Sequence, residues 1–142
     1  MIRAMPDPVE MLAEVPLFAG VRRRELKRLA DRMSERTFTE GEVAVEEGRG
    51  GAGFWLIQDG SATVSIGGEI IRTLGPGEFF GEIALLDDGP RTATVTAGTD
   101  MRCLGMASWE FRPFILDHPE VALTMLQTLA RRLREAEARA GT

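Results

Sequence analysis

The middle of the chain consists of short apolar runs that are separated by glycine-containing turns. Runs of this length between turn signals predict β-strands rather than helices. The predicted strands are Glu42–Glu46, Phe54–Gln58, Ala62–Ile66, Ile70–Leu74, Thr92–Thr96 and Met101–Met106. Asp59-Gly60 and Gly67-Gly68 are typical of two-residue hairpin turns. Many short strands at even spacing predict an antiparallel sandwich or barrel over residues 37–107.

The residues before this β region are predicted to form helices. Pro8 suits the first turn of a short helix that ends before Pro16. A second helix is predicted from about Val21 to Met33, because its apolar residues recur at helical spacing. The first 36 residues are therefore expected to be N-terminal helices.

Two further helices are predicted after the β region. Ser108 suits the cap of a helix over Trp109–Asp117. Pro119 suits the first turn of a final helix that runs to about Ala140. Residues 108–142 are therefore expected to be C-terminal helices that follow the β region.

Small and apolar residues step by four and three along the final helix. They are Ala122, Leu126, Leu129, Leu133, Ala136 and Ala140. Such a stripe fits packing on the helix's own barrel, a lid over a ligand, or a dimer seam. Packing with some lid role is favoured over dimerisation. Pro113 and the His118-Pro119 pair are natural hinge points for such a lid.

Length and composition favour one globular domain with no nucleic-acid or membrane role. The 142 residues are enough for one domain, and the net charge of −5 argues against a general nucleic-acid binder. No direct DNA binding is expected, since no helix-turn-helix fits beyond Thr142. No apolar stretch approaches the roughly 20 residues of a membrane span, and the N-terminus lacks a signal peptide. A cytoplasmic protein is expected, and the single Cys103 suits a reducing compartment.

The segment 79–94 carries the clearest chemical signal. It sets Gly81-Glu82 nine positions ahead of Arg91, with small residues beside both. A glycine lets an anion approach the backbone closely, and an arginine fork matches two phosphate oxygens. A glutamate among those groups would repel a phosphate unless it accepted a hydrogen bond from something else, such as a sugar hydroxyl. The segment therefore predicts a pocket for one phosphate and one neighbouring hydroxyl.

This pattern closely resembles the phosphate-binding cassette of the cyclic nucleotide-binding domain family. The resemblance extends to Val15-Pro16-Leu17-Phe18, to the strand Phe54–Gly60 and to His118-Pro119 with its long helix. It implies a mainly β fold, a jelly-roll β-barrel flanked by α-helices, in a single domain of residues 1–142. The N-terminal helices would occupy residues 1–36, the barrel 37–107, the cassette 79–94, and the C-terminal hinge and lid helices 108–142.

The resemblance also implies a set of ligand-binding residues. In the family, the residue matched by Arg91 pairs with the cyclic phosphate, and the one matched by Glu82 accepts from the ribose 2′-hydroxyl. Amides near Gly81, Ala84 and Ala93 complete the phosphate cradle. The full implied set is Phe80, Gly81, Glu82, Ile83, Ala84, Arg91, Thr92, Ala93, Val64, Leu74 and Leu133.

The resemblance assigns the base-facing residues less clearly than the phosphate-binding residues. Val64 and Leu74 match the family's base-facing walls, with Arg72 at the rim, but the two apolar residues fit a plain core equally well by pattern. A hydroxyl at Thr92 can bond a guanine amino group in the family, yet many cAMP receptors also carry Ser or Thr there, so it does not decide the base. Leu133 is the residue expected to close over the purine.

Two kinds of enzyme are disfavoured. Gly48–Gly53 matches GxGxxG, but a strand rather than a helix is expected next, which excludes a dinucleotide fingerprint. A metal-dependent enzyme on a similar barrel would need two or three histidines, and the chain has only His118. Cys103 lies in a strand with no candidate base nearby in the sequence, which favours a buried structural thiol.

The expected function is a non-catalytic receptor for a cyclic nucleotide that signals by moving its C-terminal helix. The ligand is expected to be cAMP, with cGMP as the second choice, and no cofactor is implied. The expected partner is an effector protein acted on in trans, and the chain is expected to be a monomer or a homodimer through the C-terminal helix. The alternative is a degenerate domain of the same family that serves as a protein-interaction scaffold.

Overall fold

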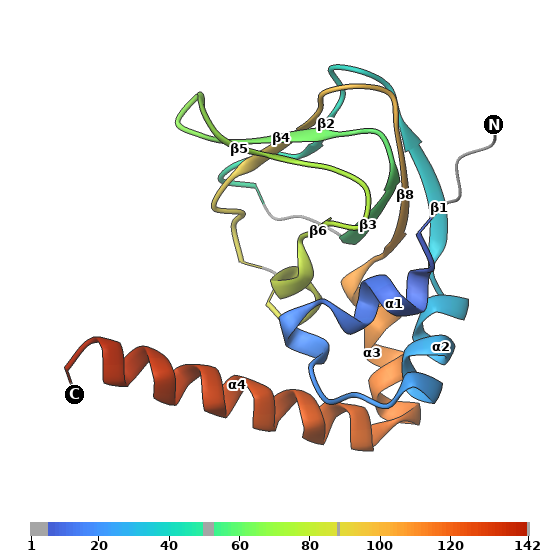
Figure 1. The fold of residues 1–142 in the computed structure, drawn as a ribbon, viewed down its shortest axis with the longest axis vertical. Helices are drawn as coiled ribbons and strands as arrows, with labels where there is room; N and C mark the ends of the chain where they lie inside the picture. The colour runs from blue at the N-terminus through green and yellow to red at the C-terminus, as the bar shows by residue number, and fades with distance from the viewer. Residues whose placement is uncertain (1–5, 50–52, 88, 142) are drawn as a thin grey trace.

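The computed structural model describes residues 6–49, 53–87 and 89–141 (Figure 1). Within these residues the strands form two four-stranded antiparallel sheets. One sheet has the order β1 (Ser34–Phe38), β8 (Met101–Met106), β3 (Phe54–Asp59), β6 (Phe79–Phe80). The other has the order β2 (Val43–Val45), β7 (Thr94–Ala97), β4 (Ala62–Ile66), β5 (Glu69–Leu74). The strands pair in nested order, β1 with β8, β2 with β7, β3 with β6 and β4 with β5, as in a jelly roll, and the predicted fold class is confirmed.

The main β core lies between the two sheets. Side chains from both contribute to it: Phe38, Val45, Ile57, Ala62, Val64, Leu74, Phe80, Val95, Ala97, Met101 and Cys103. Alternate residues of β3 and β8 point to the opposite face, where the helices pack. Burial raises the pKa of the Cys103 thiol to about 12, so this cysteine stays protonated and unreactive.

The helices share a second apolar core with the outer face of the β1-β8-β3-β6 sheet. They are α1 (Pro8–Ala13), η1 (Pro16–Phe18), α2 (Arg23–Asp31), α3 (Ser108–Asp117) and α4 (Pro119–Arg139), with η2 (Glu82–Leu85) inside the cassette. Phe18 lies at the centre of this core, with ring centroids 5.9 Å from Phe54 and 6.3 Å from Phe111. The N-terminal and C-terminal helices are therefore joined to the β-sheet by one cluster of aromatic rings.

Several boundaries differ from the sequence-based expectation. β1 begins at Ser34 rather than at about residue 37, and α2 ends at Asp31. The first four residues of β1 are exposed and only Phe38 is buried, so no apolar alternation marked this strand. β7 begins at Thr94 instead of Thr92. β3 follows Gly53 directly, which supports excluding the dinucleotide fingerprint; residues 50–52 of that loop lie outside the described residues.

The cap of α3 is not the one predicted. Ser108 is already the first helical residue, and Ala107 occupies the N-cap position. The Glu110 carboxylate instead accepts a hydrogen bond from the Ala107 amide at 2.9 Å. This contact fixes the amide before the helix, as half of a capping box does.

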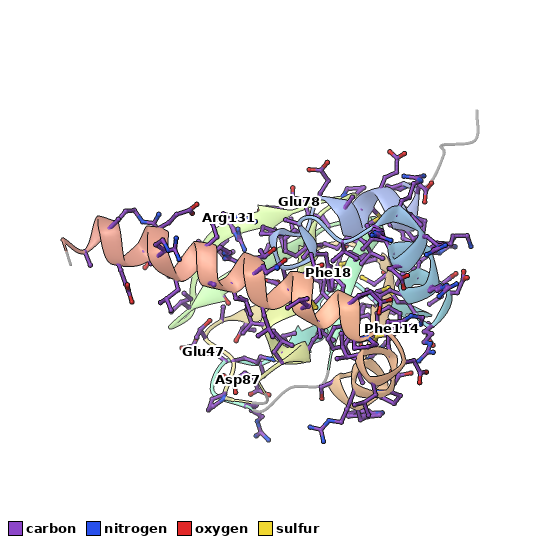
Figure 2. All side chains as sticks on the ribbon, turned by 90° about the horizontal axis from the view of Figure 1, so that it is seen from below. Phe18, Glu47, Glu78, Asp87, Phe114 and Arg131 are labelled. Atoms are coloured by element: carbon purple, nitrogen blue, oxygen red, sulfur yellow. The ribbon has the colours of Figure 1, made fainter. Side chains whose placement is uncertain are left out.

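The contact face of α4 also differs from the predicted stripe. Val121, Met125 and Thr128 are buried, whereas Leu126 and Leu133 are 63% and 61% exposed. The prediction that the stripe packs on the helix's own barrel is therefore wrong for these two leucines. After Leu129 the helix leaves the body of the domain, and residues 130–141 are all exposed (Figures 1 and 2).

None of the described helices combines the length and the apolar character needed to cross a bilayer.

Candidate functional site

A cavity of about 610 Å³ opens beside the cassette. Its walls come from β2, β4, β5 and β7 and from the segment 78–93. Ten of the predicted site residues line it: Val64, Leu74, Phe80, Gly81, Glu82, Ile83, Ala84, Arg91, Thr92 and Ala93. The eleventh, Leu133, lies on the exposed part of α4 and is not among the lining residues. The fold therefore brings together residues from four strands and the cassette, and the two most distant of them, Val45 and Val95, are 50 positions apart in the sequence.

Arg91 is the main positive group of this cavity. Its Nη2 donates a hydrogen bond to the Gly53 carbonyl at 2.9 Å, and its Nε is buried without a hydrogen-bond partner among the described residues. Loss of water around the guanidinium lowers the pKa of Arg91, and the nearby Glu82 carboxylate opposes this shift. The side chain remains charged because an arginine is not deprotonated in a protein. It is therefore a partly desolvated cation with spare donors for an anion.

The backbone of Arg91 is held as firmly as its side chain. Its amide donates to the Arg49 carbonyl at 2.9 Å, and its carbonyl accepts from the Gly48 amide at 2.8 Å. The Glu47 amide donates to the Thr94 hydroxyl at 2.9 Å. These bonds join the end of the cassette to the loop after β2, so the position of the guanidinium is set by two segments that lie far apart in the sequence.

Gly81 is required by its surroundings as well as by its conformation. Its φ of +84° lies in the left-handed region, which favours glycine. A Cβ at this position would collide with the Gly53 carbonyl oxygen and would lie 2.9 Å from Nη1 of Arg91. The missing side chain therefore leaves the space in which the Arg91 guanidinium meets the Gly53 carbonyl.

Glu82 and Ala84 belong to η2, which follows Gly81 directly. The first amides of a helix have no partner within it, so the start of η2 can supply donors to a bound anion. The Ala84 amide, expected in the phosphate cradle, donates to the Gly81 carbonyl at 3.1 Å. Glu82 is partly exposed at the cavity wall, and its charge acts on Arg91. A negatively charged acceptor thus lies close to the guanidinium of Arg91 in the wall of the cavity.

The remaining walls are apolar on one side and polar at the rim. Val64 and Leu74 are 5% and 2% exposed, and they line the cavity while also belonging to the core between the sheets. The core interpretation is therefore confirmed, and contact of these two residues with a base stays a prediction. Thr92 and Arg72 are exposed lining residues.

Seven lining residues were not among the predicted ligand contacts: Val45, Glu78, Phe79, Asp87, Gly89, Pro90 and Val95. Val95 pairs with Val64 across the β4–β7 ladder, so the alternation of those strands could have placed it in the cavity. Glu78 carries no comparable signal, because nothing in its local sequence distinguishes it from other surface carboxylates. Asp87 lies inside the predicted cassette 79–94, but no ligand contact was assigned to it. Asp88 of the cassette lies outside the described residues.

The chain was compared with known proteins. A family profile described as "Cyclic nucleotide-binding domain" matches residues 35–118. The N-terminal domain of a transcriptional regulator from Streptomyces coelicolor superposes with a TM-score of 0.82 at 32% identity, covering 92% of this chain and 94% of that one.

Two relatives are full-length regulators. A CRP-like cAMP-activated global transcriptional regulator of Mycobacterium tuberculosis is 33% identical over 130 residues, covering 88% of this chain and 58% of the relative. A cAMP-dependent protein kinase regulatory subunit of Yarrowia lipolytica is 37% identical over 112 residues, covering 75% and 30% respectively. The chain therefore spans less than two thirds of these relatives. With the jelly-roll order of its strands and the matched segment, which includes the whole cassette, the chain belongs to the cyclic nucleotide-binding domain family.

Proposed function

We propose that this domain is a non-catalytic receptor for a purine cyclic nucleotide, with cAMP as the preferred ligand and cGMP as the second choice. The observation that carries the proposal is Arg91, a desolvated cation with spare donors in the wall of the cavity beside Gly81 and Glu82. The similar regulators named above carry cAMP in their names, which supports the order of the two ligands.

The arrangement of the cavity fits each part of such a ligand. Its volume of about 610 Å³ lies within the range of roughly 300–1,000 Å³ that is usual for small-molecule sites. The cyclic phosphate would lie against Arg91 and the start of η2, and Glu82 would accept from the ribose 2′-hydroxyl. The apolar surfaces of Val64 and Leu74 would cover the purine. The Thr92 hydroxyl at the rim is a donor that either purine could use, so this residue does not distinguish cAMP from cGMP.

Binding of cAMP should raise the thermal stability of the domain. At a ligand concentration one hundred times the dissociation constant, the stabilisation should be roughly 2.7 kcal/mol, which corresponds to several degrees in Tm. Calorimetry and thermal melting with cAMP, cGMP and AMP measure it directly, with AMP as the control that lacks the cyclic phosphate. If millimolar cAMP and cGMP both give no heat and no shift in Tm, the receptor proposal fails and the scaffold alternative is favoured.

Glu82 should contribute mainly through the ribose. Glu82→Ala should lower the affinity for cAMP several-fold but should change the affinity for 2′-deoxy-cAMP little, because both changes remove the same hydrogen bond. Glu82→Gln should cost less, since it keeps an acceptor. Calorimetry on this double cycle gives the result, and losses that simply add would mean that Glu82 faces another group.

The output of the receptor is proposed to be α4. Its second half is exposed, and Leu123, Leu126 and Leu133 present apolar side chains to solvent. An effector in trans or a second copy of the chain would bury them. A nucleotide shifts the position of α4 only if its contacts differ between the two positions, and closure of Leu133 over the purine would supply that difference.

Amide exchange along residues 120–140 should therefore slow when nucleotide binds. Leu133→Ala should weaken cAMP binding without unfolding the barrel, whereas Leu123→Ala, an equally exposed leucine nearer the start of the helix, should leave it unchanged. Hydrogen-exchange mass spectrometry reports the first result and calorimetry the second. Protection of the cassette with unchanged exchange in α4 would show that the helix does not act as a lid.

A further inference from the structure

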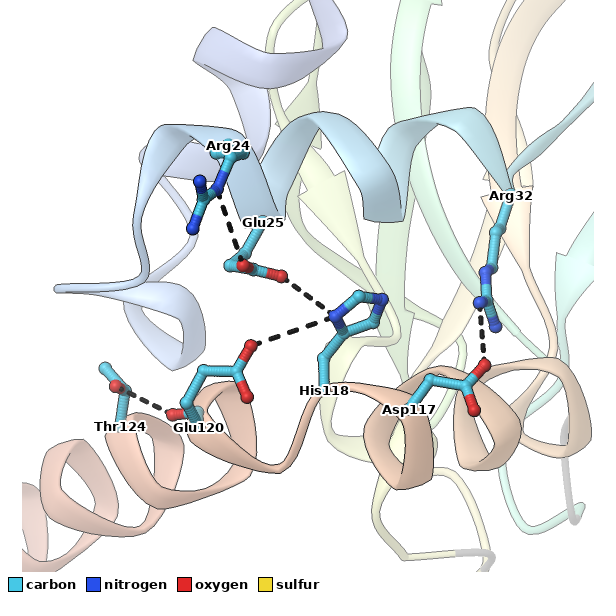
Figure 3. Close-up of polar contacts among 7 residues, drawn as sticks. All are labelled: Arg24, Glu25, Arg32, Asp117, His118, Glu120 and Thr124. Atoms are coloured by element: carbon cyan, nitrogen blue, oxygen red, sulfur yellow. Dashed lines mark hydrogen bonds and ion pairs between the residues drawn. The ribbon is translucent and has the colours of Figure 1, made fainter.

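Three potential metal ligands meet where α2 passes the junction between α3 and α4 (Figure 3). Glu25 comes from α2, His118 lies between the two C-terminal helices, and Glu120 is in the first turn of α4. His118 Nδ1 lies 3.1 Å from Glu25 Oε2 and 3.8 Å from Glu120 Oε1. One ligand atom from each residue lies within 4.8 Å of the others. None of these residues lines the nucleotide cavity.

Glu25 is the unusual member of this cluster, because a carboxylate is rarely buried without full pairing. Its side chain is 5% exposed, and Oε2 has no hydrogen-bond partner in the described parts of the chain. The contact with His118 has the distance of an ion pair without the alignment of a hydrogen bond. Arg24 approaches the other oxygen only to 4.0 Å, and its side chain is 69% exposed. A further cation between Glu25 and His118 would satisfy the orphaned oxygen.

The spacing of the donor atoms suits a small divalent ion. Zinc bonds to imidazole and carboxylate measure about 2.0–2.2 Å, which places two tetrahedral ligands about 3.3 Å apart. The observed separations of 3.1 and 3.8 Å bracket this value. Glu120 is 57% exposed, so one side of the cluster is open to solvent for metal exchange and for a water ligand.

The surroundings hold the imidazole in place. The ring of Phe114 lies 4.7 Å from that of His118. Directly before His118, Asp117 at the end of α3 pairs with Arg32, the C-cap residue of α2, at 2.9 Å (Figure 3). These contacts keep α2 close to the α3–α4 junction, so binding would need little rearrangement of the ligand side chains.

We propose that Glu25, His118 and Glu120 form a binding site for a divalent transition-metal ion, Zn²⁺ in the first instance. The ion would displace any proton from His118 and connect α2 to the first turn of α4. It would thereby restrict the direction in which α4 leaves the domain. If the proposed receptor function also holds, metal and nucleotide should change each other's affinity by the same factor.

Zinc titration of the metal-free, untagged full chain tests the site without any nucleotide. His118 is the only histidine, so imidazole resonances report on this site alone. We expect one equivalent of Zn²⁺ to bind, with the change in ¹⁵N shift at Nδ1 rather than Nε2. A chain that binds no zinc at millimolar concentration would show that Glu25 and His118 form an ion pair only. A shift at Nε2 alone would show that zinc binds through the ring nitrogen that does not face Glu25, and either result would overturn the proposal.

Substitutions of Glu25 and Glu120 test whether these two carboxylates are metal ligands. Glu120→Gln, at an exposed position that should not disturb folding, is expected to weaken zinc binding roughly tenfold or more, and Glu25→Gln at least as much. Glu135→Gln on the exposed part of α4 and Cys103→Ser are controls that should leave binding unchanged. Zinc affinity that is insensitive to Glu120→Gln would overturn the proposed ligand set even if Glu25→Gln does not fold. An unchanged cAMP affinity in the presence of zinc would remove the coupling to α4 but not the metal site.

Discussion

Arg91→Ala is expected to weaken cyclic nucleotide binding by roughly 30-fold or more. A hydrogen bond to a charged group is worth about 1.5–3 kcal/mol, and the partly dry wall of the cavity favours the upper part of this range. Arg91→Lys should restore only part of the loss, because lysine keeps the charge but not the planar fork. Isothermal titration calorimetry with cAMP gives both values.

Arg102→Ala is the matched control for this change. Arg102 lies on β8 in an exposed ion pair with Glu35 and does not line the cavity, so its loss should leave affinity within the error of the measurement. If Arg91→Ala binds cAMP within threefold of the natural chain, the phosphate does not lie at this arginine.

Gly81→Ala should strongly weaken cyclic nucleotide binding and also lower the stability of the domain. The left-handed conformation of Gly81 disfavours any side chain by about 1–2 kcal/mol, and the added methyl group would collide with the Gly53 carbonyl. Because this carbonyl accepts the hydrogen bond from Arg91, its displacement should move the guanidinium as well. We expect the loss in affinity to be as large as that of Arg91→Ala.

Gly41→Ala is the control for Gly81→Ala, because it separates the effect of backbone strain from the effect of a steric collision. Gly41 has a φ of +86°, nearly that of Gly81, but apart from its own chain neighbours no atom of the described residues lies within 4 Å of the position of an added Cβ. It should therefore lose stability through strain alone and bind cAMP normally. Denaturant unfolding and calorimetry on the two variants give the comparison, and equal effects on affinity would argue against a local role for Gly81.

Much of the β-sheet and of the site could be predicted because each depends on local sequence. The six predicted strands alternate or carry apolar runs between turn residues, and all six are present. The cassette was found because Gly81, Glu82 and Arg91 have to lie at a fixed spacing for their joint chemistry. β1 was missed because only Phe38 among its residues is buried.

What could not be predicted depends on segments that meet only in the folded chain. The carbonyl that holds Arg91 belongs to Gly53, 38 residues earlier, in a glycine-rich loop whose sequence carries no sign of this contact. The face of α4 was misassigned for a similar reason. A polar residue, Thr128, occupies the buried stripe because its hydroxyl donates to the Ala19 carbonyl at 3.0 Å, a contact between residues 109 positions apart. Regular spacing of leucines carries no information about such a partner.

Because the hydrogen bond of Thr128 ties α4 to the domain, the part of the helix beyond Thr128 can move as a rigid arm. Beyond this anchor the helix continues to Arg139, a free arm of about 16 Å at 1.5 Å per residue. A tilt of about 10° at the anchor would displace its far end by about 3 Å, while the turns near Val121 would hardly move. A partner bound to the last turns of α4 would therefore be displaced together with the end of the helix. A partner bound near Val121 would be displaced hardly at all.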